Sequence, residues 1–102
     1  MSKILKFDIN GQSLNWRNQC RILKGTSNFF NIQVNPDSMW DGLDLIAVFS
    51  SDVDPENAIR LDGKKSCVIP DEAINSDSFS FYIYGYKDEL HVRSRSYKID
   101  LS

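Results

Sequence analysis

The chain contains the alternating stretch Phe79-Ser80-Phe81-Tyr82-Ile83-Tyr84-Gly85-Tyr86, and this stretch decides the fold. Its odd-numbered side chains are apolar up to Ile83, while serine and tyrosine occupy the even positions. A period of two predicts a β-strand with one face in a core, because successive side chains of a strand point to opposite sides. A turn at residues 87–89 then leads into a return strand that carries Leu90 and Val92 on the apolar parity.

The same alternation recurs along the rest of the chain. Asn10-Gly11 and Asp62-Gly63 have the composition of tight hairpin turns. Pro70 to Ile74 has the composition of a first helical turn, but the polar residues that follow predict a corner and not a helix. The run from Leu43 to Phe49 is apolar on both faces, which predicts a central strand. We predict the further strands at residues 5–9, 14–16, 30–34, 43–49, 59–61, 67–69 and 97–101.

These short strands are separated by turns and lack any long helix, so we expect an all-β fold, an antiparallel two-sheet Ig-like β-sandwich. The apolar parity changes between Val92, which is even-numbered, and Tyr97 and Ile99, which are odd-numbered. A bulge or bend near Ser94-Arg95-Ser96 would absorb this one-residue shift.

The length of 102 residues predicts a single domain, residues 1–102, with a core large enough to fold without metal or disulfides. The net charge of -2, with both signs interspersed, disfavours nucleic acid as a partner. The absence of a long apolar run or an export signal disfavours a membrane and predicts synthesis and assembly in a cytoplasm. Cys20 and Cys67 are expected to be free, buried thiols, and a disulfide between them is the alternative.

Catalytic, metal and cofactor motifs are not found. His91, the only histidine, lies between two apolar residues of a predicted strand and is expected to face solvent. The acidic segment of residues 52–57 resembles the start of a calcium loop, but Asn57 replaces the required glycine and Gly63 the bidentate glutamate. We therefore expect no enzyme activity, no catalytic residue, no bound metal and no cofactor.

A candidate interaction surface follows from the decisive strand. If its phenylalanines are in the core, Tyr82, Tyr84 and Tyr86 form a stripe on the opposite face. Tyrosine is favoured at interfaces because it combines a large rigid apolar body with a polar tip. Trp40 is the other aromatic residue that we expect to contribute, so the predicted protein-binding residues are Tyr82, Tyr84, Tyr86 and Trp40.

The chain resembles small β-sandwich modules in the tail, baseplate and head-fibre proteins of phages and prophages of Gram-positive bacteria. The segments that carry this resemblance are Leu14-Asn15-Trp16, Leu23-Lys24-Gly25-Thr26, Phe30-Asn31-Ile32-Gln33-Val34, Trp40-Asp41-Gly42-Leu43, Ala47-Val48-Phe49, Cys67-Val68-Ile69-Pro70 and Tyr84-Gly85. The resemblance implies a non-enzymatic structural or attachment module of a virion. It also implies other virion proteins as partners, a homo-oligomer, and no catalytic residues.

Two other functions are compatible with the sequence. A carbohydrate-binding or host-surface adhesion module would use exposed aromatic residues, Trp40 and the tyrosine stripe, to stack on a host-surface glycan. A small hydrolase or isomerase would need a site that the sequence does not reveal. Glycan binding would favour the adhesin, and neighbouring genes for capsid and tail proteins would favour the virion.

Overall fold

The computed structural model of the chain describes residues 3–26, 29–52 and 56–101. The elements in chain order are β1 (Lys3–Asn10), β2 (Ser13–Trp16), β3 (Phe30–Pro36), the 3-10 helix η1 (Ser38–Trp40), β4 (Asp44–Ser51), β5 (Asn57–Arg60), β6 (Ser66–Val68), α1 (Asp71–Ile74), β7 (Ser78–Lys87), β8 (Leu90–Arg93) and β9 (Tyr97–Asp100). Across these ranges no helix is long and apolar enough to cross a membrane.

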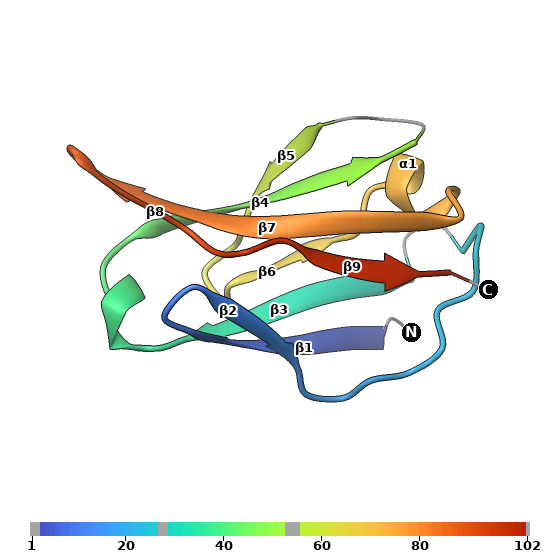
Figure 1. Cartoon of the computed structure of the whole chain (residues 1–102), viewed down its shortest axis with the longest axis horizontal. Helices are drawn as coiled ribbons and strands as arrows, with labels where there is room; N and C mark the ends of the chain where they lie inside the picture. Colours follow the sequence, from blue (N-terminus) through green and yellow to red (C-terminus); the bar gives the residue numbers. More distant parts are fainter. Residues whose placement is uncertain (1–2, 27–28, 53–55, 102) are drawn as a thin grey trace.

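The strands form two packed sheets (Figure 1). The four-stranded sheet has the order β2-β1-β3-β6, and the five-stranded sheet has the order β5-β4-β7-β8, with β9 also paired to β7. The expected all-β two-sheet sandwich is confirmed. One pairing differs from the antiparallel pattern, because β1 and β3 run parallel, with Lys3 beside Phe30 and Phe7 beside Val34. The long connection after β2 returns the chain to the end of the sheet where β1 begins, which parallel pairing requires.

The core lies between the two sheets and follows the predicted parity. Leu5, Phe7 and Ile9 of β1 are fully buried, and so are the odd-numbered Phe79, Phe81 and Ile83 of β7. Phe7 meets Phe81 edge to face across the sandwich, with ring centroids 4.9 Å apart. Burial of each such side chain stabilises the fold by roughly 1.5 to 3 kcal/mol, so this interdigitated layer is the main source of stability.

The connection between β5 and β6 differs from the hairpin expected at Asp62-Gly63. The strand β5 belongs to the five-stranded sheet and β6 to the four-stranded sheet, so the chain crosses from one layer to the other. Leu61 is buried at this crossing, and Asp62 accepts hydrogen bonds from the backbone of Lys64 and Ser66. These bonds are the main cause that lowers the pKa of Asp62 below its usual 3.8. The positive φ of the turn, 60°, falls on Lys65 and not on Gly63.

The parity shift near the C-terminus is a one-residue bulge, as the sequence predicted. Tyr84 of β7 pairs with Arg93, whereas Phe81 pairs with Tyr97, so Tyr82 and Ile83 lie opposite residues 94–96. Ser94 is buried, its N–H donates to the Ile83 carbonyl, and its Oγ accepts from the Ile83 N–H at 2.8 Å. The side chain therefore completes the hydrogen bonding that the bulge would otherwise interrupt.

Candidate functional site

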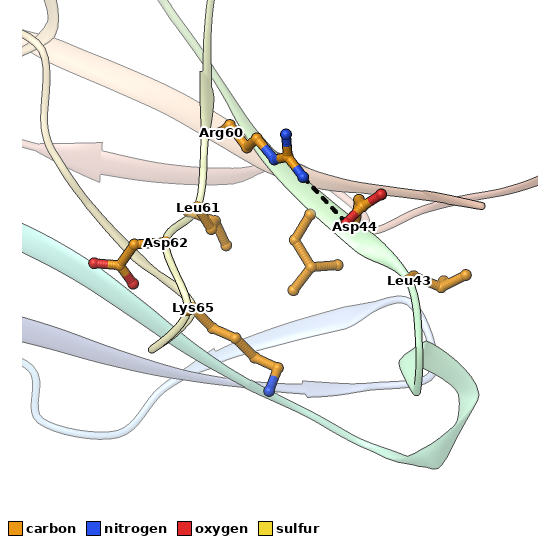
Figure 2. Close-up of a pocket in the computed structure, with 8 residues that line it drawn as sticks. Leu43, Asp44, Arg60, Leu61, Asp62 and Lys65 are labelled. Atoms are coloured by element: carbon orange, nitrogen blue, oxygen red, sulfur yellow. Dashed lines mark hydrogen bonds and ion pairs between the residues drawn. The ribbon is translucent and has the colours of Figure 1, made fainter.

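One hollow lies at the side of the sandwich where β4 starts and the β5–β6 crossing begins (Figure 2). It measures about 270 Å³ and is lined by Leu43, Leu45 and Leu61 together with charged groups. The Arg60 guanidinium is 3.3 Å from the Asp44 carboxylate, and Asp62 holds the turn described above. Arg60, Asp44 and Asp62 therefore already have partners within the fold, and the residues that line the hollow include no histidine, cysteine or serine.

The cysteines and the acidic segment carry no site chemistry in the described parts of the chain. Cys20 and Cys67 are both free thiols, half-buried against the core. Burial raises the pKa of the Cys67 thiol to about 12, so it is protonated at neutral pH. No group of three or more histidine, cysteine, aspartate or glutamate residues in the described ranges could hold a metal ion. Residues 53–55 of the calcium-loop-like segment lie outside the described residues.

The outer face of the five-stranded sheet carries the predicted tyrosines. Tyr82, Tyr84 and Tyr86 project there from β7, on the side opposite the buried phenylalanines. The register places Val48 beside Tyr82 and Ile46 beside Tyr84 on β4, and Arg93 beside Tyr84 and His91 beside Tyr86 on β8. We call this surface the tyrosine face, and its residues are Ile46, Val48, Tyr82, Tyr84, Tyr86, His91 and Arg93.

Contacts between neighbours hold the aromatic side chains of the tyrosine face in place. The Arg93 guanidinium carbon lies 3.8 Å from the centroid of the Tyr82 ring, a cation–π contact. The Tyr84 hydroxyl hydrogen-bonds Nδ1 of His91, and the Tyr84 ring stacks on Tyr86 with centroids 6.2 Å apart. His91 and Arg93 of β8 thus each contact the tyrosine diagonal to the one they pair with. Long side chains can span the distance between diagonal positions on neighbouring strands.

Val48 shows how closely this surface is packed. Its side chain is only 8% exposed, yet it does not belong to the core cluster between the sheets. It points to the tyrosine face, where Ala58 and Tyr82 flank it in the two neighbouring strands. The tyrosine face therefore has an apolar layer that is covered by the tyrosine rings and surrounded by polar groups. Protein interfaces likewise have a buried apolar centre and a polar rim.

Trp40 is not part of this surface, and its predicted place among the protein-binding residues is wrong. The side chain is 1% exposed, and its Nε1 donates to the Gly11 carbonyl at 2.8 Å. The ring lies over Gly85 of β7, where a Cβ atom would come within 2.9 Å of it. The short helix η1 turns the side chain inward, so Trp40 closes one end of the core.

The sequence pattern found the three tyrosines but not the rest of the tyrosine face. The alternation makes Ile46 and Val48 the second apolar face of a central strand and puts His91 and Arg93 on one face of the return strand, but it names no neighbour for either pair. Only the β4–β7 and β7–β8 registers bring these residues next to the tyrosines. The sequence did contain one signal for this surface, the apolar residues Ile46 and Val48 on the outward side of β4. An outward apolar pair on a central strand needs large side chains on the neighbouring strands to cover it.

Comparisons with known proteins place the chain in no family. It matches no protein-family model, and no curated protein and no solved structure is similar enough to support an assignment.

Proposed function

We propose that this chain is a non-enzymatic structural or attachment module of a phage or prophage particle, in its tail, baseplate or head fibre, and that it binds neighbouring proteins through the tyrosine face. The virion setting rests on the resemblance of the sequence segments quoted above. The observation that supports protein contact is the ordered surface of Tyr82, Tyr84 and Tyr86, fixed by His91 and Arg93. Rigid aromatic side chains with arginine are the typical anchors of protein interfaces.

The preferred partner is a second copy of the chain, followed by other virion proteins. A central layer of Ile46, Val48 and tyrosine rings surrounded by polar groups has the anatomy of an interface centre with its rim. Self-association through this face would give the homo-oligomer that the resemblance implies, with the module located in the virion.

The alternative, a carbohydrate-binding or host-surface adhesion module, is less well supported on this face. Glycan stacking uses the flat face of an aromatic ring. Arg93 occupies one face of Tyr82, and Tyr84 and Tyr86 stack on each other. Trp40, the other proposed platform, is buried. The aromatic rings therefore present edges and hydroxyl groups, which suit a protein partner better than a sugar ring.

Sedimentation of the purified chain tests this proposal, with the double variant Tyr82→Ser, Tyr84→Ser as the probe. We expect the wild type to self-associate and the variant to associate at least about thirtyfold more weakly, because interface hot spots contribute about 2 kcal/mol or more. A glycan array with the same two proteins separates the adhesin from the attachment module. Tyrosine-dependent glycan binding by a monomeric wild type would contradict the proposal.

A further inference from the structure

A basic hollow lies on the outer face of the four-stranded sheet, on the other side of the sandwich from the tyrosine face. It measures about 290 Å³, and the residues that line it include Lys6, Arg17, Gln33, Lys64 and Lys65 but no acidic residue. Four basic residues line this hollow although the protein as a whole carries a net charge of -2. We call this surface depression, lined by Lys6, Arg17, Lys64 and Lys65, the basic hollow.

The backbone fixes the positions of these four residues. Lys6 of β1 pairs with Gln33 of β3 in the centre of the sheet. On one side, the Arg17 N–H donates to the Lys6 carbonyl at 2.8 Å. On the other side, the Gln33 amide donates to the Lys64 carbonyl, and the Lys65 carbonyl accepts from the Val34 N–H. The backbone therefore brings these four residues to the hollow from β1, the end of β2 and the β5–β6 crossing.

Three of the four cations form no ion pair among the described residues, although the charge of Lys64 helps to lower the pKa of the nearby Asp62. Arg17 Nε lies 3.5 Å from an Asp8 carboxylate oxygen, whereas the amines of Lys6, Lys64 and Lys65 form no ion pair there. Positive groups around one concavity raise the local concentration of anions. A phosphate group, with several acceptor oxygens, suits cations that approach from different directions.

A second hollow of about 350 Å³ continues from the first and shares Arg17 and Asn35 with it. It is lined by Asp8, Asn10, Pro36 and Asp37 as well. Both carboxylates already accept from groups of the fold, so a hydroxyl group would use their second lone pairs or the amide oxygens of Asn10 and Asn35. Its two carboxylates would repel an extended polyanion such as a nucleic-acid backbone. The positive region is therefore confined to the space of one or two phosphate groups.

We infer that the two adjoining hollows bind a phosphorylated sugar, with its phosphate among Lys6, Arg17, Lys64 and Lys65 and its hydroxyl groups against Asp8, Asn10 and Asn35. This site is separate from the tyrosine face, so loss of either one would leave the other intact.

Titration of the isotope-labelled full chain with glucose 6-phosphate, followed by nuclear magnetic resonance, tests the inference. Glucose, inorganic phosphate and a short oligothymidylate are the comparison probes. We expect saturable shifts at the amides of Lys6, Arg17, Gln33 and Lys65 with glucose 6-phosphate, weaker binding of inorganic phosphate and none of glucose.

Two charge-matched variants make the test specific. Lys6→Gln with Lys64→Gln should raise the Kd for glucose 6-phosphate at least about tenfold, whereas Lys87→Gln with Lys98→Gln, on the other sheet, should leave it unchanged. No binding by the wild type up to roughly 10 mM, or equal loss in both variants, would overturn the site. Inorganic phosphate binding as tightly as glucose 6-phosphate, or oligothymidylate binding more tightly, would overturn the assignment to a sugar.

Discussion

Gly85 and Trp40 show how one position decides the packing of another. The inner positions of β7 carry large apolar side chains up to Ile83, and the next inner position is Gly85. Because Gly85 has no side chain, the Trp40 ring and a Leu43 methyl group occupy the space beside it. Glycine inside a strand is unfavourable by itself and often marks such a close approach. The sequence showed Gly85 within the decisive strand, but it could not show that a tryptophan forty-five positions earlier fills the space.

Replacing Gly85 with alanine is expected to destabilise the protein by about 1 to 3 kcal/mol, because the new Cβ would lie 2.9 Å from the Trp40 ring and force it to move. Chemical denaturation followed by tryptophan fluorescence measures the change. Gly63→Ala is the control, since nothing lies within 4 Å of a Cβ at that position. Equal stability of Gly85→Ala and the wild type would show that Trp40 does not occupy this space.

Cys67 gives a second residue-scale prediction, because burial holds its thiol pKa at about 12. In a Cys20→Ala variant, iodoacetamide at pH 8 should label the native protein at least about a hundredfold more slowly than the unfolded protein, since only the thiolate reacts. Because the pKa of Cys67 is higher in the folded protein than the ordinary 9.0, burial of the protonated thiol contributes fully to the stability of the fold below pH 9.0. This contribution is lost as the pH rises from 9.0 toward 12, where the thiol ionises. Mass spectrometry follows the labelling, and equal rates in both states would contradict the burial.

The bulge between β8 and β9 is the element that determines which side chains reach the tyrosine face. It lets His91 and Arg93 point outward while Tyr97 and Ile99 keep the core parity of β7. The shift could be predicted from the sequence because it changes the parity of the apolar residues. The hydrogen bonds of Ser94 could not be predicted, because serine at that position is equally compatible with an exposed turn.

Removing the Ser94 hydroxyl is expected to cost about 1 to 3 kcal/mol, because Ser94→Ala leaves the buried Ile83 N–H without its side-chain acceptor. Ser96→Ala, at an exposed position of the same bulge, should change stability by less than about 0.5 kcal/mol. Thermal or denaturant unfolding compares the two variants. A Ser96→Ala effect as large as that of Ser94→Ala would contradict the proposed role of the Ser94 side chain.

At this scale the strands and the central position of β4 follow from local patterns, and the sheet partners do not. The one-turn helix α1 stands where the sequence predicted a corner without a helix. Alternation shows which face of a strand is buried but not which strand lies beside it. The parallel β1–β3 pairing and the passage of residues 61–65 between the sheets are set by long-range packing. Leu90 illustrates the same limit: its parity predicted burial, but it lies beside Lys87 at the tip of a hairpin and is 55% exposed.

The whole molecule presents two different outer faces on one apolar core. The five-stranded sheet presents the tyrosine face, and the four-stranded sheet presents the basic hollow beside a carboxylate-lined hollow. The two faces point in opposite directions, so one module could bind a protein on one side and a small anion on the other. The tyrosines followed from the sequence, whereas the basic hollow did not, because its cations come from three separate segments.

Sedimentation equilibrium of the wild type and the Tyr82→Ser, Tyr84→Ser variant tests the central claim most directly, since it measures whether the tyrosine face joins copies of the chain. A matched control, Leu23→Ser with Met39→Ser, removes exposed apolar side chains elsewhere. We predict an oligomer for the wild type and the control, and association at least about thirtyfold weaker for the folded double tyrosine variant. A wild type that stays monomeric, or a tyrosine variant that associates as strongly as the wild type, would contradict the account.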